Sequence, residues 1–175
     1  MKRYDKRRTE EIRKQLFKGE RWNTDTVMNI LHLLIEKEPS LERGLVDVVD
    51  SGFLSRVVDS DVVPQHSIEV MQKYLSETKL LLLPVFSQEH WSLLVYLKKG
   101  KVWYHCDSMG QMHSERVNFI LARLHLLKIY DGLDQEQRRV SFHPLLKKQE
   151  GQDECGTYLT MYAMSFIFIG LTFPS

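Results

Sequence analysis

Three compact apolar segments in the middle of the chain constrain its fold more than any other feature. They span residues 79–86, 91–97 and 102–106, and the polar, glycine-containing sequence KKGK separates the last two. Short apolar runs joined by such a turn are typical of a β-hairpin. The sequence therefore predicts a small central β-sheet.

Helical patterns surround these predicted strands. Thr24 is a candidate N-cap for a helix that ends near Pro39, and Ser67 is a candidate cap for another. A strongly periodic helix is expected at 114–128, and an apolar helix from about Cys155. The pattern of helices, sheet and helices is typical of an α+β domain.

Weaker signals complete the predicted architecture. They indicate a helix at 5–18, short helical pieces and loops over 41–63, and an edge strand at 139–142. A length of 175 residues suits a single domain. We therefore expect one domain over residues 1–175, with a basic helical segment at 1–20.

Charge and composition argue against nucleic-acid and membrane partners. The formal net charge is +1, so no overall field attracts polyanions. The first 21 residues carry nine Lys/Arg against four Asp/Glu, a mixture that favours a solvated helix face. The apolar stretch at 158–173 is shorter than the roughly 20 residues of a spanning helix, and we interpret it as a core helix.

The cysteine count and the N-terminal sequence favour an intracellular protein, cytoplasmic or nuclear. Only two cysteines occur, Cys106 and Cys155, which is typical of a reducing compartment. The N-terminal residues lack the apolar segment of a signal peptide.

Cys155 is the better candidate nucleophile of the two cysteines. It lies between a polar, glycine-containing loop and an apolar helix, and the N-terminus of a helix stabilises a thiolate. Gly156 follows it and has no side chain to obstruct a substrate carbonyl. Cys106 lies inside a strand-like run. Against this, a free cysteine is most often a buried residue that fills space.

His90 is the histidine best placed to act as a base. It stands between the polar segment at 87–89 and the strand that begins at Trp91. Asp107 follows the second strand of the hairpin, and the start of one antiparallel strand neighbours the end of the next. A carboxylate there is able to hold an imidazole in one tautomer. The other histidines are interpreted as parts of helices, strands or their ends: His32, His66, His105, His113, His125 and His143.

Four spaced elements resemble the ubiquitin-like-protein proteases, which comprise the SUMO-specific proteases and the deneddylases. The matching positions, in family order, are His90-Trp91, Asp107-Ser108, Gln149 and Cys155-Gly156. Trp22 and Asp25 match the family segment that precedes a helix, whereas Asn23 and Thr24 depart from it. Glu154 stands where the family usually has Asp. The resemblance covers roughly residues 20–170.

The resemblance implies a papain-like cysteine protease fold, in which a buried helix carries the nucleophile. It implies that Cys155 is the nucleophile, His90 its base and Asp107 the residue that orients the base. Gln149 would donate a side-chain N–H to the oxyanion, beside the backbone N–H of Cys155. No cofactor and no metal are implied.

The resemblance also implies a substrate. Trp22 and Trp91 would form the walls of a narrow channel that admits the Gly-Gly tail of a ubiquitin-like modifier. Gly156 would border that channel, and Asp25 would bind the basic tail region of the modifier. The expected partners are a ubiquitin-like protein and its conjugates. Which modifier is bound depends on the surface that grips its globular body, expected at 40–76.

Several alternatives remain open at this stage. Related bacterial effectors use a similar residue set to transfer acetyl groups, although they typically have Glu in place of Asp107. A viral polyprotein protease shares the scaffold. A non-catalytic binding module would be expected to have lost a catalytic residue. Taken by itself, Trp91 is also explained as an ordinary core residue of a strand. A metal site at 105–113 is a further alternative, but the residues there lack the usual ligand spacing.

Overall fold

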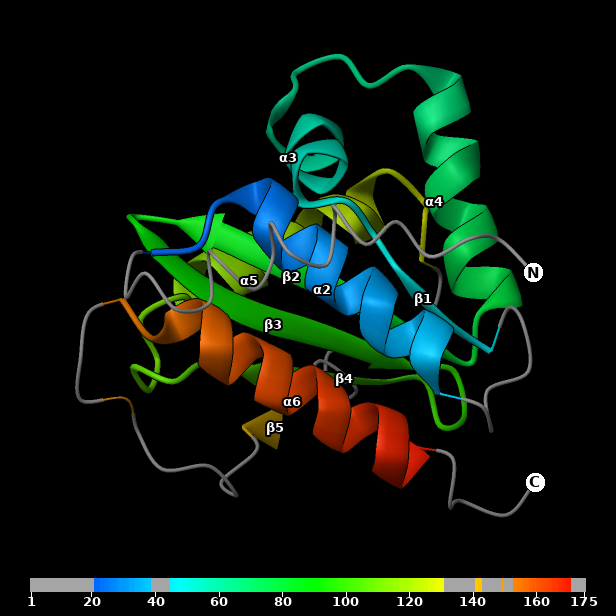
Figure 1. Ribbon diagram of the computed structural model, residues 1–175. Helices are drawn as coiled ribbons and strands as arrows, with labels where there is room; N and C mark the ends of the chain where they lie inside the picture. The colour runs from blue at the N-terminus through cyan, green and yellow to red at the C-terminus, as the bar shows by residue number, and fades with distance from the viewer. Residues whose placement is uncertain (1–20, 39–44, 131–140, 143–148, 150–152, 171–175) are drawn as a thin grey trace.

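The computed structural model describes residues 21–38, 45–130, 141–142, 149 and 153–170 (Figure 1). Its sheet has five strands in the order β1-β2-β3-β4-β5. The strands are β1 (Val46–Val48), β2 (Leu80–Ser87), β3 (His90–Leu97), β4 (Val102–Cys106) and β5 (Ser141–Phe142). The central three are antiparallel, while β1 is parallel to β2 and β5 is parallel to β4. The prediction of a small mixed sheet is confirmed.

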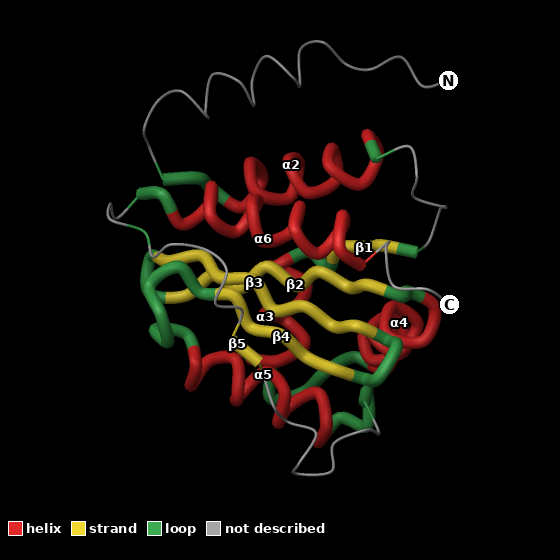
Figure 2. The backbone as a smooth tube through the Cα atoms, turned by 90° about the horizontal axis from the view of Figure 1, so that it is seen from below, coloured by secondary structure: helices red, strands yellow, loops and turns green. Residues whose placement is uncertain are grey.

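The helices form two layers, one on each face of the sheet (Figure 2). They are α2 (Thr24–Lys37), α3 (Ser51–Asp59), α4 (Gln65–Glu77), α5 (Ser114–Leu126) and α6 (Cys155–Gly170). Helices α2 and α6 share a hydrophobic core with one face of the sheet. Helices α3, α4 and α5 share a second core with the opposite face.

The continuous apolar sequence of β2 follows from this two-sided cover. Leu80 and Leu82 face α2 and α6, whereas Leu81 and Leu83 face the opposite layer. A strand buried on both faces has no polar side to alternate with. Pro84 is tolerated near the middle of β2 because the pairing with β1 ends at Leu82, so β2 is an edge strand at that point.

A tight turn places the candidate base at the start of β3. Gln88 and Glu89 form the two-residue connection between β2 and β3, and both have positive φ, 48° and 60°. Such turns match the right-handed twist of the strands they join. Ser87 therefore pairs directly with His90, at the end of the sheet where β4 also ends.

The strand and helix predictions are largely confirmed, with two corrections at helix starts. Asn23, not Thr24, caps α2, because its Oδ1 accepts hydrogen bonds from the backbone N–H and the hydroxyl of Thr26. Helix α4 begins two residues before Ser67, after Pro64, which fixes φ for helix entry. Thr24 and Ser67, the predicted caps, are polar residues that lie one and three positions after the true caps, so the sequence alone does not distinguish them.

The segment at 41–63 was only partly predicted. It contains helix α3, but also the short strand β1, which the sequence analysis missed. β1 is three residues long and includes Asp47, so it carries no clear alternation. Residues 5–18 and 139–140 lie outside the described residues, and β5 occupies the sheet edge as expected.

The apolar helix α6 is a core helix on one side. Its buried residues, Cys155, Leu159, Tyr162, Ala163, Phe166 and Ile167, face the sheet and α2. Met161, Met164 and Phe168 are exposed on its outer side. Among the described helices, α6 included, none has the length and apolar character needed to cross a membrane.

Candidate active site

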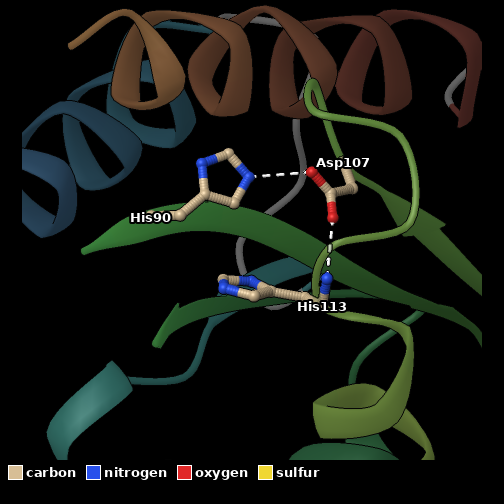
Figure 3. Close-up of side chains that lie close together, drawn as sticks. All are labelled: His90, Asp107 and His113. Atoms are coloured by element: carbon tan, nitrogen blue, oxygen red, sulfur yellow. Dashed lines mark hydrogen bonds and ion pairs between the residues drawn. The ribbon is translucent and has the colours of Figure 1, made fainter. Parts of the chain in front are cut away.

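His90 and Asp107 form a buried hydrogen-bonded pair where β3 begins and β4 ends (Figure 3). His90 Nε2 lies 2.8 Å from Asp107 Oδ1. Their side chains are 3% and 0% exposed, so water competes little for this bond. The antiparallel hairpin brings the two residues together, as the sequence predicted.

Three donors hold the carboxylate of Asp107. Oδ1 accepts the backbone N–H of Met109 at 2.9 Å in addition to the His90 ring, and Oδ2 accepts the backbone N–H of His113 at 3.0 Å. Burial acts to raise the pKa of Asp107, but the bonds from His90, His113 and Met109 outweigh it and lower the pKa to about 2. Asp107 is therefore a fixed carboxylate at neutral pH.

Cys155 is the first residue of α6, and its side chain is fully buried. Burial acts to raise the pKa of the thiol. The interaction with His90 and the backbone N–H groups of Trp91 and Gly156 outweigh burial and lower that pKa. Helix N-termini concentrate such N–H groups and stabilise negative charge. Cys106 lacks these partners, and burial raises its pKa to about 12.

The pKa of His90 is shifted in the direction opposite to that of Cys155. Burial alone would lower the pKa of His90, but its interactions with Asp107 and Cys155 raise it to about 9. Nδ1 has no nitrogen or oxygen hydrogen-bond partner within the described part of the chain. A raised histidine pKa beside a lowered thiol pKa favours a thiolate–imidazolium pair at neutral pH. The arrangement is chemically competent for nucleophilic attack.

Gln149 is held by two hydrogen bonds to Ser108, the residue after Asp107. The backbone N–H of Gln149 donates to the carbonyl of Ser108 at 3.1 Å, and the Ser108 hydroxyl donates to Gln149 Oε1 at 2.5 Å. Ser108 directly follows Asp107, so the amide is anchored to the residue next to the carboxylate. The sequence analysis quoted Ser108 as part of the motif but assigned it no role.

Trp22 contacts both Trp91 and Gly156, the residue that follows Cys155. The indole Nε1–H of Trp91 donates to the backbone carbonyl of Trp22 at 2.8 Å. A Cβ atom built on Gly156 would lie 2.7 Å from Trp22 Cε3, closer than any real contact. Gly156 is therefore needed for the close approach of Trp22. The expectation that its missing side chain also leaves room for a substrate carbonyl stays a prediction.

Charged residues connect the segment before α2 to this site. Arg21 Nη1 lies 2.5 Å from Glu89 Oε2, in the turn before His90, and Arg21 Nε lies 3.6 Å from Asp153 Oδ1, two residues before Cys155. Asp25 is exposed in the first turn of α2, three residues after Trp22. Sequence analysis did not identify Arg21, because the basic N-terminal run gave it no distinguishing pattern.

A second histidine, His113, lies next to the His90–Asp107 pair. Its ring centroid is 4.9 Å from that of His90, and one ligand atom from each of His90, Asp107 and His113 falls within 4.8 Å of the others. These atoms are already engaged: His113 Nε2 bonds to the Ser87 carbonyl and Nδ1 to the Ser92 hydroxyl. A metal ion would have to displace those hydrogen bonds, so the residues do not form a ready metal site.

Solved structures show the same architecture as this chain. A de-sumoylating protease superposes with a TM-score of 0.67 at 18% identity, over 92% of this chain and 68% of that one. XopD, an effector of Xanthomonas campestris bound to ubiquitin, gives 0.61 at 22% identity, over 87% and 77%. The Ulp1 protease domain in complex with SMT3, the yeast ortholog of SUMO, gives 0.56 at 12% identity, over 97% and 87%. At these identities the likeness establishes the fold.

The family assignment rests on a sequence match. Curated protein sequences give no significant match to this chain. Residues 21–171, however, match the Ulp1 protease family, C-terminal catalytic domain. That match covers most of the chain and confirms the predicted family and enzyme class. The chain belongs to the Ulp1 protease family and is a cysteine protease.

Proposed function

We propose that this enzyme cleaves the peptide or isopeptide bond after the Gly-Gly tail of a ubiquitin-like modifier, with Cys155 as nucleophile. The observation that carries the proposal is the coupling of Cys155, His90 and Asp107 at the start of α6, in a chain of the Ulp1 protease family. Structures with ubiquitin and with SMT3 exist for similar folds, which supports this class of partner.

The proposed reaction has two halves, acylation of Cys155 and hydrolysis of the thioester. The Cys155 thiolate attacks the carbonyl carbon of the terminal glycine, and the His90 imidazolium gives its proton to the leaving amine. Water then attacks the thioester carbonyl while His90 takes a proton from that water. The C–S bond breaks to restore the Cys155 thiolate, and the tail leaves as a carboxylate whose remaining proton goes to solvent. Asp107 stays ionised throughout and holds Nε2 of His90, so that Nδ1 faces the reaction.

Gln149 is our candidate for stabilising the negative oxygen that forms in each step. Ser108 holds its amide by Oε1, which orients the opposite, N–H side of the group. The backbone N–H of Cys155 at the start of α6 is the second proposed donor. Losing one donor of this kind typically raises a barrier by about 2.7–4 kcal/mol.

Trp22, Trp91 and Gly156 form our proposed boundary of the tail-binding channel. Trp22 packs against Trp91 and against Gly156, and both tryptophans share a hydrophobic core with the helix that carries Cys155. The proposed path of the tail runs close against the indole rings, where side chains do not fit, which accounts for a Gly-Gly requirement. Asp25, exposed near Trp22, is proposed to contact a basic residue of the modifier tail.

The alternative activities differ from this proposal in their products. An acetyltransferase would pass an acetyl group from Cys155 to an amine, and a polyprotein protease would cleave inside an unrelated chain. The two free cysteines fit a reducing environment, and we propose an intracellular location, in the cytoplasm or nucleus.

The proposal is tested with a panel of ubiquitin-like modifiers whose C-terminal glycine carries an electrophile. We expect at least one modifier to form a covalent adduct with the protein, and peptide mapping to place it on Cys155. Cys155→Ala is the control and should form none. If no modifier labels Cys155 while acetyl-coenzyme A acetylates it, the transferase alternative replaces the protease.

A further inference from the structure

A chain of buried polar side chains lies under the His90–Asp107 pair, on the side of the sheet that faces α5. It consists of His113, Ser92 and His105, all at most 4% exposed. His113 Nε2 lies 2.9 Å from the Ser87 carbonyl, His113 Nδ1 lies 2.8 Å from Ser92 Oγ, and His105 Nε2 lies 3.2 Å from the same oxygen. Polar groups at this depth are costly to bury unless each has a partner.

The bonding partners fix the direction of each hydrogen bond among these polar side chains. The Ser87 carbonyl is able only to accept, so His113 Nε2 carries a proton and donates. A neutral imidazole then has an acceptor at Nδ1, which takes the Ser92 hydroxyl proton. The Ser92 oxygen in turn accepts the N–H of His105. Burial lowers the pKa of both histidines, to about 4 for His105, so both rings are neutral at neutral pH.

The backbone of His113 connects these polar side chains to the His90–Asp107 pair. Its backbone N–H donates to Asp107 Oδ2, while the His90 ring bonds to Oδ1 (Figure 3). The His113 ring is bonded to Ser87 at the end of β2 and to Ser92 in β3, the strand that begins with the candidate base. Ser87 pairs with His90 across the β2–β3 turn, and Ser92 is two residues further along β3. One residue thus fixes the carboxylate relative to the strand that holds the imidazole.

We propose that Ser92 and His113 are positioning residues, which hold the Asp107 carboxylate in line with His90. The proposal rests on the catalytic roles given above to His90 and Asp107. Asp107 and His113 are the two ends of a loop that has to fold back so that its end contacts its beginning. The bond from the His113 ring to Ser92 anchors the far end of that loop to the sheet. Without that bond the loop end is free to shift, and the Asp107 carboxylate shifts with it relative to His90. A displacement of about 1 Å lowers rates by as much as 100-fold.

The distinguishing experiment compares Ser92→Ala and His113→Ala with Val117→Ala. Val117 is a buried residue of α5 in the same layer. Its truncation removes apolar packing but keeps every side chain of the polar network and the backbone bond from Val117 N–H to the His113 carbonyl. We measure kcat and KM with a modifier substrate, the melting temperature, and the pH profile of Cys155 alkylation by iodoacetamide. The assays are run well below the melting temperature of every variant.

We expect Ser92→Ala and His113→Ala each to lower kcat about tenfold while KM changes less than twofold. The imidazolium of His90 should also be less well held, so the upper apparent pKa in the alkylation profile should move to lower pH. The double variant should be no slower than the slower single variant, because both remove one anchor. Ser92→Thr, which keeps the hydroxyl, should recover most of kcat. Val117→Ala should lower the melting temperature and leave kcat and the profile unchanged.

Two results would overturn the positioning role. One is a kcat for Ser92→Ala within twofold of wild type. The other is a loss that Val117→Ala reproduces, with no change in the alkylation profile. The alkylation profile needs no modifier, so it tests the role of Ser92 and His113 even if the wild-type enzyme cleaves no modifier. Absence of cleavage by the wild type counts against the proposed function alone.

Discussion

At the scale of single residues, Gly156 and Trp22 determine how closely the segment before α2 approaches the proposed nucleophile. A Cβ at position 156 would lie 2.7 Å from Trp22 Cε3. We expect Gly156→Ala to lower the free energy of unfolding by about 1–3 kcal/mol, the usual effect of overpacking, and to reduce kcat. Chemical denaturation and turnover measure the two effects.

The double variant provides the control for this clash. In a Trp22→Ala background the added methyl group has no ring to meet, so Gly156→Ala should then affect stability by less than about half as much. An equal loss in both backgrounds would show that the contact with Trp22 is not the reason for glycine at this position.

The same residues predict a strict requirement for glycine in the substrate tail. A methyl group on either tail glycine would press on the indole rings or shift the scissile carbonyl. We expect Gly→Ala at either tail position to lower kcat/KM by at least about tenfold, or about 1.4 kcal/mol. Trp22→Ala should slow catalysis and reduce this discrimination. Equal rates for Gly-Gly, Ala-Gly and Gly-Ala tails with the wild-type enzyme would contradict the channel.

At the scale of elements, the start of α2 depends on one side chain. Asn23 Oδ1 accepts the backbone N–H of Thr26 at 2.9 Å and its hydroxyl at 2.8 Å. Asn23→Ala should lower the free energy of unfolding by about 1 kcal/mol, the usual effect of losing an N-cap. Thr24→Ala should change it by less than about half of that. Equal losses of stability for the two variants in urea denaturation would contradict the assignment of Asn23 as the N-cap.

The helices and strands differ in how well the sequence predicts them. The central strands carry strong apolar runs between polar turns, so their bounds were predicted to within a residue or two. Helix caps and the strand β1 depend on contacts with distant residues: β1 is a strand because Val46 and Val48 pair with Leu80 and Leu82. No local pattern records such pairing.

Local sequence likewise predicted some features of the candidate site and not others. The hairpin alone predicted the proximity of His90 and Asp107, and the position before an apolar helix singled out Cys155. The roles of His113, Ser92 and Arg21 were not predicted, because their partners lie on other elements. His113 in particular was interpreted as an ordinary residue before a helix, and only its contacts with Ser87 and Ser92 distinguish it.

At the scale of the whole molecule, the His90–Asp107 pair makes stability depend on pH. The folded pKa of His90, about 9, lies above the usual 6.5 of an unfolded histidine. Its stabilising contribution is therefore complete below about pH 6.5 and is lost as the pH rises through about 9. The pKa of Asp107 is lowered to about 2, so its contribution is present above about pH 4 and is lost as the pH falls through about 2.

We accordingly expect the free energy of unfolding to be flat with respect to this pair between about pH 4 and 6.5. The contribution of His90 should fall by roughly 1–3 kcal/mol between pH 6.5 and 9.5, while the lowered thiol pKa of Cys155 contributes in the opposite direction over the same range. In Asp107→Asn, which removes the carboxylate that raises the histidine pKa, the fall above pH 6.5 should be much smaller. Identical pH profiles for the two proteins in urea denaturation would show that the pair is not strongly coupled.

The central claim concerns the whole enzyme: Cys155, and not Cys106, is the nucleophile that cleaves after the tail of a modifier. Cys155 has partners that lower its thiol pKa, whereas burial raises that of Cys106 to about 12. The direct measurement is the cleavage rate of a modifier carrying a fluorophore after its Gly-Gly tail, compared for the wild type, Cys155→Ala and Cys106→Ala. We predict that Cys155→Ala folds and shows no cleavage, and that Cys106→Ala keeps kcat within about threefold. Cleavage by a purified, folded Cys155→Ala protein at the wild-type rate would contradict the account.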